Sequence, residues 1–141
     1  MGAFAKAFLC PANFRPAEVR RALASVNPGA VVQTMKPGKE SNEFFLEMLA
    51  AQTLLAESSG ALLAKKAEVD LLLRFARTTQ ISTAISRFGS KEGRSFLAVA
   101  AGKRKISVPE DLARYELQRK ELSAPELERI ESAALLDARR A

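Results

Sequence analysis

Basic side chains are concentrated in residues 65–94, where their spacing suits contact with a run of phosphate groups. The segment holds seven Lys or Arg residues against three Asp or Glu residues. On a helix, Lys66 and Arg74 are about two turns apart and Arg77 follows three residues later, so the three can share one ridge. Such a ridge favours an anionic partner: a nucleic acid, an acidic protein face or a phosphorylated ligand. An ordinary solvated helix face is the alternative interpretation.

The composition argues against catalysis. The 141 residues include no His and a single Cys, Cys10, so Ser–His and Cys–His nucleophile pairs and an internal disulfide are impossible within this chain, and a zinc site is disfavoured. Carboxylate pairs could still perform acid–base chemistry, but the acidic residues fall mostly where helices need caps or solvated faces. We expect no enzymatic activity, metal or cofactor, and Cys10 in the core. A carboxylate enzyme is the least favoured alternative.

Apolar runs and turn signals predict the elements that position these side chains. Strands are expected at 3–10, 30–34 and 96–100, and helices from Pro16, after Ser41 or Asn42, at 65–76 and at 80–88. Capping boxes at Ser107–Glu110 and Ser123–Glu126 predict two more helices. This order favours one α/β (α+β) domain over residues 1–141: a small mixed, mostly antiparallel sheet covered by helices, with a C-terminal helix.

The apolar start of the chain is interpreted as a first strand and not as a secretory signal, because Lys6 interrupts it and Pro11 follows closely. The apolar runs are far shorter than the roughly 20 residues of a membrane-spanning helix. We therefore expect no membrane association and a cytoplasmic location, which also suits a lone cysteine.

Helical periodicity predicts which faces are buried. Between 80 and 88, the spacing of Ile81, Ala84, Ile85 and Phe88 predicts an inward apolar face, with Gly89 as a C′ glycine. Two other helices are read in the same way. The predicted inward stripes are Phe45, Met48, Leu49 and Leu55 in one helix, and Leu127, Ile130, Ala134 and Leu135 in the last one.

The two helices expected within 65–88 could form a DNA-reading helix-turn-helix. In that interpretation Gln80, Ser82, Thr83 and Arg87 would reach base edges. The alternative is a helical hairpin that covers a sheet, because the apolar residues of the second helix need burial. A DNA-binding regulator remains open as an alternative function.

Several short motifs resemble one known family. They are Asp70-Leu71-Leu72-Leu73-Arg74, Thr79-Gln80-Ile81, Ala84-Ile85 and Gly89-x-Lys91-x-Gly93, ahead of the apolar run at 96–100. Together they resemble the small KEOPS-complex subunit of the CGI-type, PRPK-binding family, in its archaeal branch. Members commonly carry an Asn followed by aromatics where Lys65–Glu68 stand, Glu in place of Asp70, and Ser-Gly in place of Ala76-Arg77.

The resemblance implies an accessory role in tRNA modification. KEOPS installs threonylcarbamoyl on the adenosine beside the anticodon of ANN-decoding tRNAs. The family's subunit is non-catalytic and docks on the N-terminal lobe of the kinase-like ATPase subunit. Archaeal members also grip the single-stranded 3′ CCA end of tRNA. The threonylcarbamoyltransferase subunit would be an indirect partner.

Carried onto this chain, the resemblance assigns two sets of residues. For the RNA end we expect Lys66, Arg74, Arg77, Gln80 and Lys91, with the cations neutralising phosphates and the Gln80 amide reading a base edge or ribose. Arg74 and Gln80 match the family motif, whereas Arg77 is assigned by charge alone. For the kinase-like partner we expect Leu127, Ile130, Ala134 and Leu135, unless these four complete the core.

Overall fold

The fold is built on a three-stranded antiparallel sheet whose middle strand comes last in the sequence. A computed structural model describes residues 4–38, 43–118 and 120–140 of the chain. The strands are β1 (Phe4–Cys10), β2 (Val31–Met35) and β3 (Phe96–Gly102). Their order in the sheet is β1-β3-β2, with both neighbouring pairs antiparallel. The three predicted strands are confirmed, and the sheet is purely antiparallel.

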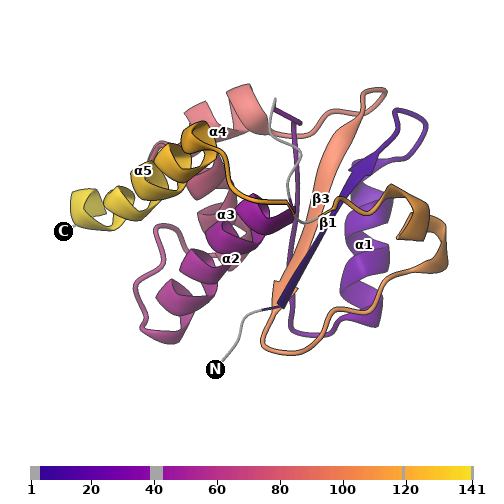
Figure 1. Cartoon of the computed structure of the whole chain (residues 1–141), viewed down its shortest axis with the longest axis horizontal. Helices are drawn as coiled ribbons and strands as arrows, with labels where there is room; N and C mark the ends of the chain where they lie inside the picture. The colour runs from indigo at the N-terminus through magenta and orange to yellow at the C-terminus, as the bar shows by residue number, and fades with distance from the viewer. Residues whose placement is uncertain (1–3, 39–42, 119, 141) are drawn as a thin grey trace.

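Helices cover both faces of the sheet (Figure 1). They are α1 (Pro16–Val26), α2 (Glu43–Ser58), α3 (Ala67–Ala76), α4 (Ile81–Phe88), the 3-10 helix η1 (Glu110–Tyr115) and α5 (Ala124–Arg140). α1 and η1 lie against one face, and α2 and α3 lie against the other. α4 packs on α3, while α5 packs on α2 and α3 and ends the chain. The predicted fold class is confirmed.

The two cores are separated by the sheet, and β3 contributes to both. Every residue of β3 is buried, since its side chains alternate between two covered faces. Leu97 and Val99 pack with α2 and α3, whereas Phe96 and Ala98 pack with α1. Cys10 lies in the second core, as predicted, and burial raises the pKa of its thiol to about 11. Small residues in β3 let both helical layers approach the sheet.

One of the two predicted capping boxes is confirmed. The Ser123 amide donates to a Glu126 carboxylate oxygen at 2.8 Å, and the Glu126 amide donates to Ser123 Oγ at 3.3 Å, at the start of α5. The box predicted at Ser107–Glu110 is wrong. The Ser107 amide and carbonyl are both hydrogen-bonded to the Asn27 side chain, and η1 begins only after Pro109. The predicted caps Ser41 and Asn42 lie outside the described residues.

The predicted inward face of α4 is only half correct. Ala84 is buried and Phe88 is half-buried, but Ile81 and Ile85 are 46% and 55% exposed. Gly89 does not take the left-handed conformation expected of a C′ glycine, since its φ is −66°. Glycine is needed at this position because the backbone packs closely: a Cβ there would lie 2.6 Å from the Ile85 carbonyl oxygen.

The predicted inward stripe of α5 is correct only at Ile130. Ala133 and Leu136 are buried and Ile130 is half-buried, whereas Leu127 and Leu135 are 47% and 64% exposed. Ala134 is exposed as well. In α2, Met48 and Leu55 are likewise exposed instead of buried.

None of the helices within the described ranges combines the length and apolar character that a membrane crossing needs.

Candidate nucleic-acid interface

Arg74 lies inside the protein and cannot contact a phosphate there. Its side chain is fully buried, with Nε 2.7 Å from an Asp70 carboxylate oxygen and Nη2 2.9 Å from one of Asp137. Nη1 also donates to Asp137 at 3.1 Å. The expectation that Arg74 faces solvent is therefore wrong: the residue ties α3 to α5.

The buried charge of Arg74 is balanced and well hydrogen-bonded. Asp70 accepts further hydrogen bonds from Thr53 Oγ1 at 2.6 Å and from the Leu63 amide at 2.9 Å. Burial alone would lower the pKa of the guanidinium, but its hydrogen bonds to Asp137 and Asp70 outweigh that effect and raise the pKa. Arg74 therefore stays ionised as part of a structural network.

The other four predicted RNA contacts are exposed, but they do not form one ridge. Lys66 precedes the first turn of α3 and Arg77 follows its last turn, so they lie at opposite ends of that helix, about 16 Å apart along its axis. Gln80 is the residue directly before α4, and its side chain forms no capping hydrogen bond. Lys91 lies beyond the end of α4, in the loop that leads to β3.

Lys91 belongs to a different basic group, which we call the basic cleft. This open hollow of about 360 Å³ is lined by Lys36, Pro37, Ser86, Arg87, Gly89, Lys91, Arg94 and Ser95. Four of these residues are cationic and none is acidic. The volume is near the lower end of the range for ligand pockets.

Backbone pairing at the end of the sheet builds the basic cleft. Met35 forms an isolated antiparallel bridge with Gly89, and the Lys36 amide donates to the Phe88 carbonyl at 2.7 Å. These contacts join the end of β2 to the end of α4. Because β2 pairs antiparallel with β3, the same end of the sheet also receives the loop of Lys91 and Arg94. Cations from three chain segments thereby converge.

The one acidic residue of the loop between α4 and β3 is partly neutralised. Glu92 lies 3.6 Å from Arg15 Nε, with both side chains mostly exposed. On the neighbouring side, Arg20 donates to Thr34 Oγ1 at 3.4 Å, and Thr34 in turn shares a 2.7 Å hydrogen bond with Ser90. Arg15 also lies 3.8 Å from Glu18, so these neighbours link the loop to the start of α1 without adding net charge to the cleft.

Apolar side chains are exposed on the same helix that borders the basic cleft. Ile81 and Ile85 lie one turn apart on α4, whose last turn supplies Ser86 and Arg87 to the cleft. Neither isoleucine lines the cleft, so α4 presents an exposed apolar side and a separate cationic side.

Sequence reasoning identified Lys91 but not Lys36, Arg87 and Arg94 as members of this group. Arg87 and Arg94 contribute to the basic content of 65–94, yet helical spacing links neither of them to Lys36. The available signal is the strand pairing: if 30–34 runs antiparallel to 96–100, the residues just after the first meet those just before the second.

The outward side of α5 forms a second exposed feature, the outer face. It carries Leu127, Ala134 and Leu135, three of the four residues predicted to bind a partner. Ile130 instead points partly inward, and its carbonyl accepts a 3.1 Å hydrogen bond from Gln52. Exposed leucines on a helix that is already anchored on its other side are available to a protein partner.

Comparisons with known proteins do not identify the chain: no family model and no curated protein matches it. Within the described ranges, no three His, Cys, Asp or Glu residues are grouped as a metal site would need.

Proposed function

We propose that the chain is a non-catalytic, cytoplasmic accessory subunit of a KEOPS-type complex that recruits tRNA through its 3′ CCA end. The single observation that carries the proposal is the acid-free basic cleft of Lys36, Arg87, Lys91 and Arg94. It is formed largely by residues in or beside the motifs that resemble the KEOPS subunit.

The chemistry of a single-stranded RNA end suits this surface. Cationic side chains neutralise consecutive phosphates, while unstacked bases need apolar or aromatic surfaces and polar groups at their edges. Ile81 and Ile85 offer the apolar surface, and Gln80 and Arg77 are exposed near the start of the same helix. The proposed RNA contacts therefore move from Arg74, which is buried, and Lys66, which lies at the far end of α3, to the basic cleft.

The outer face of α5 is the proposed dock for the kinase-like ATPase subunit, through Leu127, Ala134 and Leu135. The opposite side of α5 is fixed to the body by Arg74–Asp137 and Gln52–Ile130, which leaves the leucines accessible. The threonylcarbamoyltransferase subunit would be reached only through the complex.

Fluorescence anisotropy at fixed salt tests the RNA half of the proposal. Intact tRNA should bind, and removal of its CCA end should weaken binding at least about tenfold. The double variant K91A/R94A should cause a similar loss on intact tRNA, because each phosphate contact contributes to affinity. K65A/K66A removes the same charge at the far end of α3 and serves as the matched control, with less than about a twofold effect.

Binding that survives CCA removal unchanged would refute the assigned role of the basic cleft. Tighter binding to duplex DNA of equal phosphate content would instead support the DNA-regulator alternative. For the protein partner, Leu135→Glu should abolish capture of the kinase-like subunit, while Leu55→Glu, at an exposed leucine of α2, should not.

A further inference from the structure

A second hollow lies at the opposite end of the sheet from the basic cleft. It has a volume of about 720 Å³ and is bordered by the end of α1, the last turns of α2 and the chain that follows β3. β3 runs from Phe96 near the basic cleft to Gly102 at this hollow, a distance of about 20 Å along the strand. The two sites are therefore separate.

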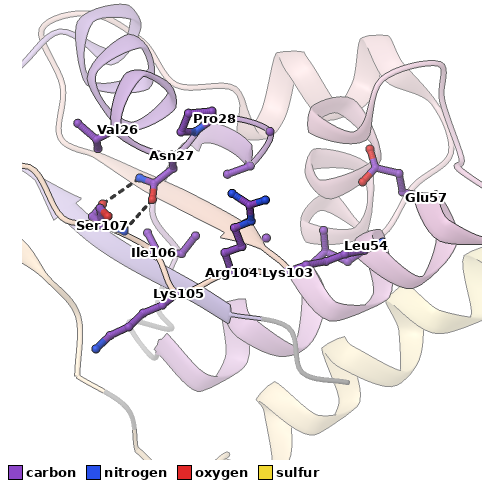
Figure 2. A pocket seen from close by; sticks show the side chains of 13 residues that line it. Val26, Asn27, Pro28, Leu54, Glu57, Lys103, Arg104, Lys105, Ile106 and Ser107 are labelled. Carbon is purple, nitrogen blue, oxygen red and sulfur yellow. Dashed lines mark hydrogen bonds between the residues drawn. The ribbon is translucent and has the colours of Figure 1, made fainter.

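Three consecutive cationic residues follow the end of β3 and line this hollow. They are Lys103, Arg104 and Lys105, and we call them the basic turn. All three are exposed, and within the described part of the chain none forms an ion pair. Figure 2 shows the Arg104 guanidinium standing inside the hollow between Pro28 and Glu57, while Lys105 points away from it. Glu57, which is exposed, is the one acidic residue of the lining.

The basic turn is held in place by Asn27. The buried Asn27 amide donates to the Ser107 carbonyl at 2.8 Å and to the Leu23 carbonyl at 3.0 Å, while its oxygen accepts from the Ser107 amide at 2.7 Å. Figure 2 shows both Asn27–Ser107 hydrogen bonds. Ile106, directly after the cations, is buried in the core. The cations are thus presented by an anchored segment, which lowers the entropy lost when they bind a ligand.

The lining offers charge but no aromatic side chain on which bases could stack. No aromatic residue borders the hollow; among its apolar members Leu54 and Ile106 are buried, whereas Val26 and Pro28 are exposed. A nucleic acid bound here would be held through its phosphates. Double-stranded RNA is recognised in this way, because proteins contact its backbone and shape and not its base sequence. A single strand would find no aromatic side chain for its bases at this site.

We propose that the basic turn and its hollow bind the phosphodiester backbone of double-stranded RNA, independently of sequence and of any 3′ tail. The inference rests on the proposed function only in taking RNA as the polyanion. It assigns the duplex part of an RNA to this end of the sheet and leaves its single-stranded end to the basic cleft.

The test compares two probes and two triple variants by fluorescence anisotropy over a range of salt concentrations. The probes are a blunt RNA duplex of 20 base pairs and the same duplex with a 3′ single-stranded CCA tail. The variants are K103A/R104A/K105A and R87A/K91A/R94A, which remove equal charge from opposite ends of the sheet. Circular dichroism and thermal unfolding check that both variants fold.

The basic-turn variant should weaken binding of the blunt duplex at least about tenfold and reduce the slope of log affinity against log salt by up to about 3, one for each cation removed. The cleft variant should change blunt-duplex affinity less than about twofold, while weakening the additional affinity conferred by the tail. Glu57→Gln, which removes the one acid of the hollow, should strengthen binding of the blunt duplex severalfold.

Equal weakening of the blunt duplex by both variants, or no effect of the basic-turn variant, would overturn the inference. Competition supplies two further arms at matched ionic strength. Displacement of the duplex by millimolar inorganic phosphate would indicate a free-phosphate site, and equal binding of a polyglutamate peptide would indicate an acidic protein partner; either would refute the proposal. If the CCA tail adds no affinity but the basic-turn variant still weakens blunt-duplex binding, the proposed function is refuted and the duplex site is not.

Discussion

Arg74 shows how strongly one side chain can hold this fold together. Removing it would leave the fully buried Asp70 carboxylate without its cation. Arg74→Ala should therefore lower the free energy of unfolding by about 3–5 kcal/mol, measured by urea denaturation. Lys91→Ala, at an exposed cation, should change it by less than about 0.5 kcal/mol. Equal stability of the two variants would contradict the structural role of Arg74.

Cys10 should be chemically silent in the native protein. It is fully buried, and burial raises the pKa of its thiol to about 11, so both access and thiolate are lacking. A thiol reagent at pH 8 should leave the folded chain unmodified for hours and react within minutes once denaturant is added. Rapid modification of the folded chain would show that the core opens readily around β1.

Glu43 should make stability depend on pH with an unusual sign. Its carboxyl is buried, one of its oxygens has no hydrogen-bond partner among the described residues, and desolvation raises its pKa above the usual 4.5 despite Lys6 at 3.9 Å. Above pH 4.5 the folded state therefore holds this proton more tightly than the unfolded state does. The contribution of the carboxyl to stability falls as the pH rises through its folded pKa.

Glu43→Gln isolates this effect. The free energy of unfolding of the native sequence, minus that of the variant, should decrease as the pH rises from 4 to 7. Urea denaturation at several pH values measures the difference. A difference that stays constant, or that increases with pH, would contradict the sign derived for Glu43.

At the scale of the helix, polar contacts tie α5 to the body beside its buried Ala133 and Leu136. Arg74–Asp137 and Gln52–Ile130 join it to α3 and α2, and Arg129 donates to the Phe75 carbonyl at 3.0 Å. The Arg129 guanidinium also lies 4.8 Å from the Phe45 ring centroid. These anchors orient the helix so that Leu136 faces the body while its neighbour Leu135 faces solvent.

The pair of adjacent leucines gives a direct test of that orientation. Leu136→Ala should destabilise the protein by about 2–5 kcal/mol, as truncation of a core leucine does. Leu135→Ala should cost less than about 0.5 kcal/mol. Thermal or urea unfolding measures both, and a reversal of their order would mean that α5 is rotated about its axis.

The error in α5 explains what periodicity can and cannot predict about helices. The helix itself and its capping box at Ser123 follow from local sequence. Its inward face does not, because Arg129 and Asp137 share that face and are satisfied by α3, far away in the sequence. An apolar stripe chosen without those partners includes Leu127, Ala134 and Leu135, which are exposed, and the same reasoning placed Ile81 and Ile85 inside.

At the scale of the whole molecule, composition and element order were enough for the fold class, while the basic cleft required the register of the sheet. Lys36 meets Lys91 only because Met35 bridges Gly89. Strand pairing over such a distance leaves no local signal in a single sequence. Arg74 shows the opposite error. Its helical spacing from Lys66 predicts a solvent-facing cation, but Arg74 is buried because it pairs with Asp70, one turn earlier in the helix.

The same register predicts where the structure is most resistant to opening. β3 is hydrogen-bonded on both edges and buried along its whole length. Its amide protons should exchange at the rate set by global unfolding, and those of the short, largely exposed α4 much faster. Hydrogen exchange followed by NMR measures this, and equal rates in the two elements would contradict the central role of β3.

The late position of β3 also has a consequence while the chain is being made. Met35 and Phe96 are separated by roughly 60 residues, which a ribosome translates in about 3–12 s. Throughout that interval both outer strands have emerged, or are emerging, without the strand that joins them. Nascent chains would then expose the unpaired β1 and β2 to each other and to chaperones. The sheet can form only when β3, seven residues of which three are alanine, has been made.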